Sequence, residues 1–117
     1  LGTLYWRKDR INKIKTDLNK KIIRKNMYWC NDVNHSNYNK QITNRRIKSE
    51  KLFRKDNKYD CLILIKYNYN RPIKNKGSAI FLHLTKDYKK TAGCVAVNKK
   101  DFFIIAKILT KKSRIVI

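Results

Sequence analysis

The sequence predicts a domain of β-strands with one helix near its C-terminal end, and three stretches indicate these elements. Residues 59–69 form an aromatic, β-branched and apolar run, which is typical of a buried strand. Residues 78–84 predict a second strand. Residues 98–112 combine a capping residue with apolar side chains at helical spacing. The length of 117 residues suits a single domain, placed here at residues 1–117.

The first half of the chain is weakly patterned. Residues 1–29 are basic, and they fit a short helix or a loop with a strand equally well. Residues 30–50 are rich in Asn, Asp and Ser, so they are expected to form an extended, loop-like connection. Residues 48–60 are expected to hold a turn of helix and then a chain reversal at Asp56 and Asn57.

The second predicted strand has two distinct faces. Successive side chains of a strand point to opposite sides, so Ala79, Phe81 and His83 are expected to share one face. The residues expected on the other face are Ile80, Leu82 and Leu84. Residues 70–78, which hold the only proline of the chain, are expected to form the preceding loop.

The predicted helix begins after Asn98, whose side chain can cap it, and Asp101 lies near its positive end. Helical spacing predicts one inward face. The residues on that face are Phe102, Ile105, Ala106 and Leu109. Residues 113–117 are expected to close the chain as a short strand.

The net charge of the chain is +22, from 30 Lys and Arg against 8 Asp and Glu. Such a field attracts polyanions, so a basic nucleic-acid-binding module is one function class to weigh. The aromatic residues that would serve it are Trp6, Tyr28, Trp29, Tyr38, Tyr67 and Tyr69. However, no nucleic-acid-binding motif is present, and Lys, Asn and Ile share A/T-rich codons. The composition therefore leaves codon bias and selection for an anionic partner both open.

The cysteines and the apolar runs exclude several classes. Three cysteines cannot all pair within one chain, and Cys30 and Cys61 form no C-x-x-C motif, so a disulfide between them is unsupported. The His and Cys spacings fit no zinc template, and neither a metal nor a cofactor is expected. The longest apolar runs, at residues 61–65 and 102–106, are far shorter than the roughly 18 residues of a membrane span.

His83 and Cys94 are the residues with the clearest chemical potential. A thiol attacks a carbonyl as the thiolate, and a nearby imidazole can take its proton. The loop between the two residues is long enough to bring them together at the rim of a sheet. Backbone N–H groups around Gly93 and Cys94 could then stabilise an oxyanion. The alternative is that both are ordinary core residues, since free cysteine is among the most buried residue types.

At these residues the chain resembles a known family. Residues 77–97, GSAIFLHLTKDYKKTAGCVAV, resemble the catalytic segment of the L,D-transpeptidase (YkuD-like) catalytic domain. The similarity is greater to a branch with a Gly-Ser-Ala-Ile-Phe-x-His strand and a Thr-x-Gly-Cys-Val-Ala turn. Weaker resemblance covers most of the remaining chain. It comprises residues 1–10 (LGTLYWRKDR), 27–42 (MYWCNDVNHSNYNKQI) and 58–78 (KYDCLILIKYNYNRPIKNKGS).

The resemblance implies a β-sandwich or barrel with Cys94 as the nucleophile and His83 as the proton donor and acceptor. It implies that the turn at Gly93 and the backbone N–H of Cys94 hold the oxyanion. Its substrates would be peptidoglycan stem peptides, with release of D-Ala and formation of a cross-link, or carboxypeptidase activity with water as acceptor. A monomer in the periplasm or cell envelope is expected, without nucleic acid as partner. A catalytically inactive wall-binding relative is the alternative.

Two departures from the family pattern matter. Many members have Arg two positions after the cysteine, where this chain has Ala96, so the group that holds the substrate carboxylate is open. Arg71 and Thr91 are the substrate-binding candidates. Further basic candidates are Lys86, Lys89 and Lys90. Because the resemblance begins at Gly2 inside the family's domain, further strands are expected to precede it. The sequence also leaves open which group orients His83, a backbone carbonyl being one candidate.

Overall fold

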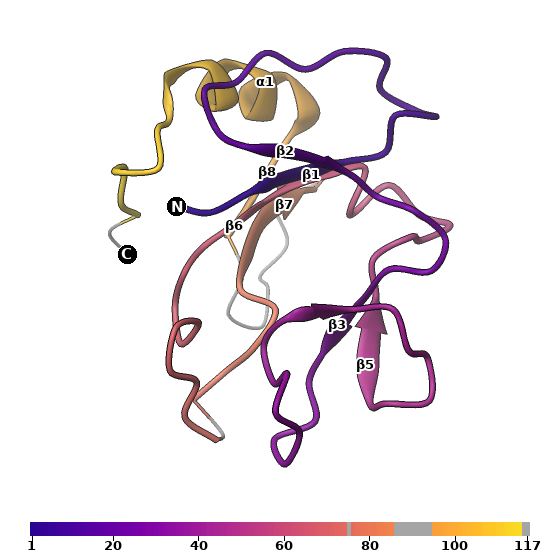
Figure 1. Cartoon of the computed structure of the whole chain (residues 1–117). Helices are drawn as coiled ribbons and strands as arrows, with labels where there is room; N and C mark the ends of the chain where they lie inside the picture. The colour runs from indigo at the N-terminus through magenta and orange to yellow at the C-terminus, as the bar shows by residue number, and fades with distance from the viewer. Residues whose placement is uncertain (75, 86–94, 116–117) are drawn as a thin grey trace.

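Two β-sheets and one α-helix make up the fold in this computed structural model, which describes residues 1–74, 76–85 and 95–115 (Figure 1). Within these residues the larger sheet has five strands. In spatial order they are β2 (Lys20–Ile22), β1 (Leu4–Trp6), β6 (Cys61–Leu64), β7 (Phe81–Leu84) and β8 (Val95–Val97). The pairs β1–β2 and β7–β8 are parallel, and β6 is antiparallel to both of its neighbours.

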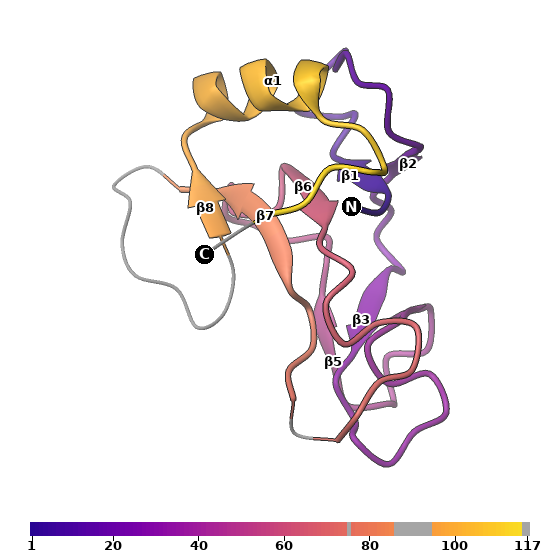
Figure 2. The same ribbon diagram turned by 90° about the vertical axis from the view of Figure 1, so that its left-hand side faces the viewer.

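The smaller sheet is antiparallel and has three strands in the described residues. They lie in the order β4 (Gln41–Ile42), β3 (Tyr28–Cys30) and β5 (Ser49–Lys51). The helix α1 (Lys99–Ile108) lies over one face of the five-stranded sheet, and β3 and β5 lie on the side away from it (Figure 2). The molecule therefore has three layers: the helix, the larger sheet and the smaller sheet.

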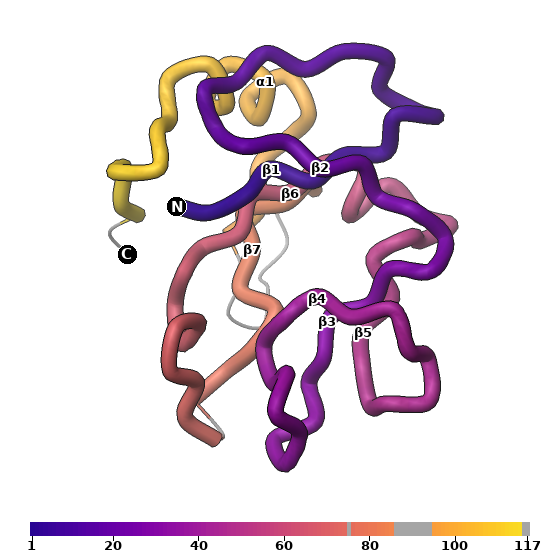
Figure 3. Tube along the Cα trace, in the orientation of Figure 1, coloured from indigo at the N-terminus to yellow at the C-terminus, as the bar shows by residue number. Residues whose placement is uncertain are grey.

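Two apolar clusters fill the spaces between these layers. On the helix side, Leu82 and Leu84 of β7 pack with Phe102 and Ala106 of α1. The irregular segment after β1 runs beside α1 (Figure 3) and adds three buried side chains to this cluster. They are Ile11, Ile14 and Leu18. On the other side, Phe81 packs with residues of the smaller sheet and its connections. The alternation predicted for β7 is confirmed, because its odd and even residues enter different clusters.

A single buried asparagine joins the smaller sheet to the loop between β6 and β7. Asn39 is 1% exposed, and its Oδ1 accepts hydrogen bonds from Trp29 Nε1 at 2.8 Å and from the Ala79 backbone N–H at 3.0 Å. Its Nδ2 donates to the carbonyls of Tyr67 and Asn68. The backbone of Asn39 has a φ of 60°, a conformation that asparagine tolerates better than most residues. This side chain fixes where the chain enters β7.

The helix prediction is confirmed at its start and in orientation, but the helix ends at Ile108 rather than near residue 112. Asn98 Oδ1 accepts a hydrogen bond from the Asp101 backbone N–H at 2.8 Å, which caps the helix at its predicted start. Phe102 and Ala106 are buried, and Ile105 and Leu109 pack against the same cluster. No helix in the described parts of the chain is long and apolar enough to cross a membrane.

Several local predictions are wrong. Residues 48–60 hold strand β5 rather than a turn of helix, and the connection expected at residues 30–50 contains β4. The strand expected at 59–69 is limited to residues 61–64. The strand expected at 78–84 begins only at Phe81, because Ala79 has a φ of 54°. These short strands depend on partners far away in the sequence, which local patterns do not reveal.

The strand expected at the end of the chain is also wrong where the structure describes it. Residues 113–115 form no strand, and the Ser113 backbone N–H instead donates to the Thr110 carbonyl at 3.0 Å. Ser113 Oγ accepts a hydrogen bond from the Thr110 backbone N–H at 2.9 Å. The backbone N–H groups of Thr110 and Ser113 are therefore used within this turn and do not pair with a neighbouring strand. Residues 116 and 117 lie outside the described residues.

Candidate active site around His83

His83 lies on β7 and points into the layer between the two sheets. The side chain is 3% exposed. Its imidazole meets the ring of Tyr59 edge-on, with 5.7 Å between ring centroids and 72° between ring planes. Tyr59 also packs edge-on against Phe81, two residues before His83 on the same face. His83 is therefore on the same face of β7 as Phe81, and that face packs into the core between the sheets.

The two ring nitrogens of His83 differ in their surroundings. Nδ1 lies 2.9 Å from the carbonyl oxygen of Leu84. Because a carbonyl oxygen only accepts hydrogen bonds, Nδ1 is the protonated nitrogen of the neutral ring, and Nε2 carries the lone pair. Nε2 is buried and has no hydrogen-bond partner among the described residues. Such an arrangement fixes one tautomer and leaves one nitrogen able to take a proton.

Burial lowers the pKa of His83, because the charged imidazolium is poorly solvated there. The hydrogen bond with Leu84 acts in the opposite direction. The charges of Lys58 and Arg54 lower this pKa further, whereas the carboxylate of Glu50 raises it. The net lowering keeps the ring neutral near pH 7, which is the protonation state that a general base requires.

Tyr59 connects His83 to the smaller sheet. The Tyr59 hydroxyl donates a hydrogen bond to Oε1 of Glu50, which lies on β5. The Leu84 backbone N–H in turn donates to the Lys58 carbonyl at 3.2 Å. The segment just before β6 is thus tied both to β5 and to the end of β7. No sequence pattern indicated Glu50 in this site, whereas Tyr59 belongs to residues 58–78, which resemble the family.

Strand β8 brings the chain after the predicted nucleophile next to His83. In the parallel β7–β8 pair, His83 is the partner of Ala96, and Leu82 is the partner of Val95. Val95 directly follows Cys94 in the sequence. Cys94 itself lies outside the described residues, and so do the other predicted site residues between β7 and β8. These are Lys86, Lys89, Lys90, Thr91 and Gly93, whose roles stay predictions.

Arg71, the remaining substrate-binding candidate, is exposed in the loop between β6 and β7. Within the described residues, no hydrogen bond or ion pair joins Arg71 to His83. Its role in binding a carboxylate therefore also stays a prediction. Nor do the described residues include any group of three or more His, Cys, Asp or Glu side chains placed to hold a metal ion.

Cys30 and Cys61 are both free thiols and both fully buried, so no disulfide joins them. Cys61 belongs to the apolar cluster under α1. Burial is the main cause that raises the pKa of the Cys61 thiol well above its ordinary value. Since the thiolate is the reactive form, neither residue has the surroundings of a nucleophile.

Half of the aromatic residues considered for stacking on nucleic-acid bases are core residues, whereas Tyr67 is exposed and Tyr28 and Tyr69 are half-buried. Trp6, Trp29 and Tyr38 are buried, and Trp29 lies at the centre of contacts with Tyr5, Tyr69 and Phe81. These rings are core residues rather than a binding surface. Burial of Trp6, Trp29 and Tyr38 weakens the case for a nucleic-acid-binding module, which stays an untested alternative.

Comparison with known proteins identifies the family of the chain. The family described as the L,D-transpeptidase catalytic domain (YkuD) matches residues 4–117. This is a family of cysteine-dependent transpeptidases that act on peptidoglycan. No curated protein and no solved structure matches the chain. The match spans nearly the whole sequence, and the mainly β fold with one helix is consistent with it. The chain belongs to the L,D-transpeptidase catalytic domain family.

Proposed function

We propose that this chain is a peptidoglycan L,D-transpeptidase that uses Cys94 as nucleophile and His83 as proton carrier. The observation that supports this most directly is the state of His83. Its Nδ1 is fixed by the Leu84 carbonyl, its Nε2 is unpartnered among the described residues, and its burial keeps the ring neutral. An ordinary core histidine would have both nitrogens satisfied.

The register of β7 and β8 supports the partnership with Cys94. Ala96 pairs with His83, while Val95 and Val97 pack against the cluster under α1 on the opposite face. Side chains alternate along a strand, so an extended residue at position 94 would share the face of Ala96 and His83. We therefore propose that the Cys94 thiol lies on the side of the sheet to which His83 points.

The proposed reaction proceeds in two acyl transfers. Nε2 of His83 takes the Cys94 thiol proton, and the thiolate sulfur attacks the carbonyl carbon of the bond to D-Ala. When the C–N bond breaks, His83 returns the proton to the amine of the departing D-Ala, leaving a thioester. The amine of a second stem then attacks this thioester. His83 transfers the amine proton to the leaving Cys94 sulfur, which regenerates the thiol. Water in place of the amine gives carboxypeptidase activity.

The proposed location and the substrate-binding groups follow from the proposed substrate. Peptidoglycan lies outside the cytoplasm, so we propose that the protein acts in the periplasm or cell envelope as a monomer. The backbone N–H groups at Gly93 and Cys94 are proposed to hold the oxyanion. Arg71 and Thr91 are proposed to bind the donor stem. The reaction itself needs neither a metal nor a redox cofactor, because each step moves only a proton and an acyl group.

The test is mass spectrometry of the protein incubated with a disaccharide tetrapeptide. The expected result is release of D-Ala and an acyl adduct that maps to Cys94, rather than to Cys30 or Cys61. Cys94→Ala should abolish the adduct. His83→Ala should slow its formation by about 100-fold or more, because a positioned general base contributes on that order.

A matched control keeps this test informative. Lys13→Gln changes an exposed side chain of the segment after β1 and should react at the unaltered rate. Circular dichroism melting of every variant would show that each is folded. If the folded wild-type protein forms no adduct on Cys94, the transpeptidase proposal is wrong. The inactive wall-binding relative would then be the better account.

A further inference from the structure

An open groove of about 530 Å³ lies beside β2, away from His83. Trp6 and Ile22 line it from the larger sheet, and Gln41 lines it from β4 of the smaller sheet. The lining residues that the structure describes are Trp6, Lys20, Lys21, Ile22, Arg24, Asn26, Met27, Gln41 and Thr43. We call this the β2 groove. Its volume falls in the range of about 300 to 1,000 Å³ that is typical of sites for small organic ligands.

The β2 groove is positively charged, and no carboxylate among its described lining residues offsets that charge. Among the described residues its lining includes Lys20, Lys21 and Arg24, all exposed, and neither Asp nor Glu. Several carboxylates of the chain are engaged elsewhere by arginines. These ion pairs are Arg7–Asp9, Arg10–Asp60 and Arg54–Asp56. The cations of the groove therefore face solvent without a neutralising partner, which favours an anionic ligand.

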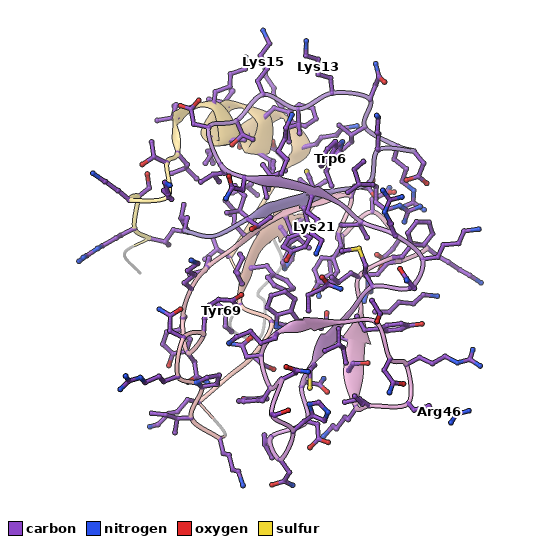
Figure 4. All side chains as sticks on the ribbon, viewed as in Figure 1. Trp6, Lys13, Lys15, Lys21, Arg46 and Tyr69 are labelled. Atoms are coloured by element: carbon purple, nitrogen blue, oxygen red, sulfur yellow. The ribbon has the colours of Figure 1, made fainter. Side chains whose placement is uncertain are left out.

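Two of the three cations have partners that fix their position, and for Lys20 these include the Ile14 carbonyl outside the lining, to which its Nζ donates at 3.3 Å. Lys21 Nζ donates to Gln41 Oε1 at 2.8 Å and so spans from the larger sheet to the smaller one. Lys20 Nζ lies 5.4 Å from the centre of the Trp6 ring, a cation–π distance. Figure 4 labels Trp6 and Lys21 on opposite sides of β2, with Trp6 on the side of α1, where it belongs to the cluster under the helix.

Arg24 differs from these two lysines. In the described parts of the chain, no hydrogen bond or ion pair engages its guanidinium group, so this planar double donor is available to an oxyanion. The amide and hydroxyl groups of Asn26 and Thr43 lie in the same lining and suit the hydroxyl groups of a ligand. The groove thus offers donors both for an anion and for a polyol.

The groove is separate from the proposed catalytic residues. It adjoins β2, at one edge of the five-stranded sheet, whereas His83 lies on β7. Three strand spacings separate β2 from β7, which is about 14 Å. A ligand in the groove would therefore not occupy the space beside the His83 ring.

We propose that the β2 groove binds a phosphate-bearing polyol segment, with Lys21 and Arg24 holding a phosphate group. Phosphate fits the bidentate geometry of a guanidinium group, and polyol hydroxyls fit the amides beside it. A nucleic acid fits less well, because Trp6, the one aromatic residue in the described part of the lining, is buried and offers little face for a base to stack on. The ligand would anchor the protein to an anionic polymer while His83 remains free.

The test measures binding of a fluorescent glycerol phosphate oligomer by anisotropy at several salt concentrations. Lys21→Gln/Arg24→Gln removes two charges from the groove. Lys13→Gln/Lys15→Gln removes two charges from exposed positions at the top of Figure 4, away from Lys21, and is the matched control. We expect the groove variant to bind about tenfold more weakly. The slope of log K against log salt should fall by about two, one for each cation removed.

Three outcomes would overturn the proposal. Equal losses in the two double variants would show that only the overall charge matters. Tighter binding of an oligothymidylate with the same number of phosphates would favour nucleic acid instead. Undiminished binding by the groove variant would place the ligand elsewhere. If that variant does not fold, Arg24→Gln alone replaces it, since its exposed side chain has no described partner to lose.

Discussion

The hydroxyl group of Tyr59 donates a hydrogen bond to Glu50, and the same Tyr59 ring lies edge-on against His83. This relationship joins the smaller sheet to the proposed catalytic base of the larger one. It places a carboxylate in a region otherwise dominated by Lys58 and Arg54. Burial is the main cause that lowers the pKa of His83, and the effect of each of these charges on it can be tested by changing one of them at a time.

Glu50→Gln is predicted to lower the pKa of His83 further. The carboxylate of Glu50 raises that pKa, so removing its charge should favour the neutral ring, while the amide can still accept the Tyr59 hydrogen bond. NMR titration of the His83 ring protons measures the shift. Asp17→Asn, which removes an exposed carboxylate elsewhere, is the control. An upward shift in Glu50→Gln would contradict the proposed role of this charge.

The stability of the protein is predicted to fall as the pH drops below roughly 6.5, the ordinary pKa of histidine. Burial lowers the folded-state pKa of His83, so between the two pKa values the unfolded state binds more protons than the folded state. The free energy of unfolding therefore decreases through this window as pH falls, and this contribution levels off below the folded-state pKa.

Urea denaturation across this pH range measures the effect. His83→Gln should lose the decrease that begins near pH 6.5, whereas His35→Gln, on the surface loop before β4, should retain it. If both variants follow the wild-type pH dependence, His83 is not the responsible group.

Asn39→Ala is predicted to destabilise the fold by about 3 kcal/mol or more. The substitution leaves the Trp29 indole N–H and the Ala79 backbone N–H without their acceptor in a buried site, and each such loss costs about 1 to 3 kcal/mol. Chemical denaturation gives the difference in free energy. Asn37→Ala, at an exposed position two residues earlier, should change stability by less than about 0.5 kcal/mol. Similar effects at both positions would disprove the joining role of Asn39.

Native alkylation is predicted to distinguish the three cysteines. Cys30 and Cys61 are fully buried, and burial raises the pKa of Cys61, so iodoacetamide should modify neither in the folded protein. Cys94 should react first at neutral pH. Peptide mapping after a short exposure identifies the modified residue, and denatured protein, in which all three react, is the control. Modification of Cys61 before Cys94 would refute this ordering.

The elements that could be predicted from the sequence are those whose conformation is determined by residues close together in the chain. Strand β7 alternates strictly, so its two faces could be assigned before its partners were known. The helix has its capping residue and its apolar spacing within about ten residues, and both Asn98 and Phe102 act as expected. In each case neighbouring residues are sufficient to specify the conformation.

The short strands of the smaller sheet and the position of Glu50 near His83 depend on residues that are far apart in the sequence. Strand β5 has three residues, and it is a strand because Glu50 pairs with Trp29 of β3. The same long-range pairing is what brings Glu50 near His83. Local patterns therefore identified His83 but not the carboxylate that acts on it, since that relationship exists only once the two sheets are packed.

The free edge of the larger sheet carries two adjacent positive charges. β2 is the outermost strand, and both Lys20 and Lys21 on it are exposed. An exposed edge offers unpaired backbone groups to any passing strand, and lysines there oppose such pairing. A second copy of this chain would meet its own like charges along that edge. The residues that line the β2 groove therefore also protect the protein against edge-to-edge aggregation when it is concentrated on a polymer surface.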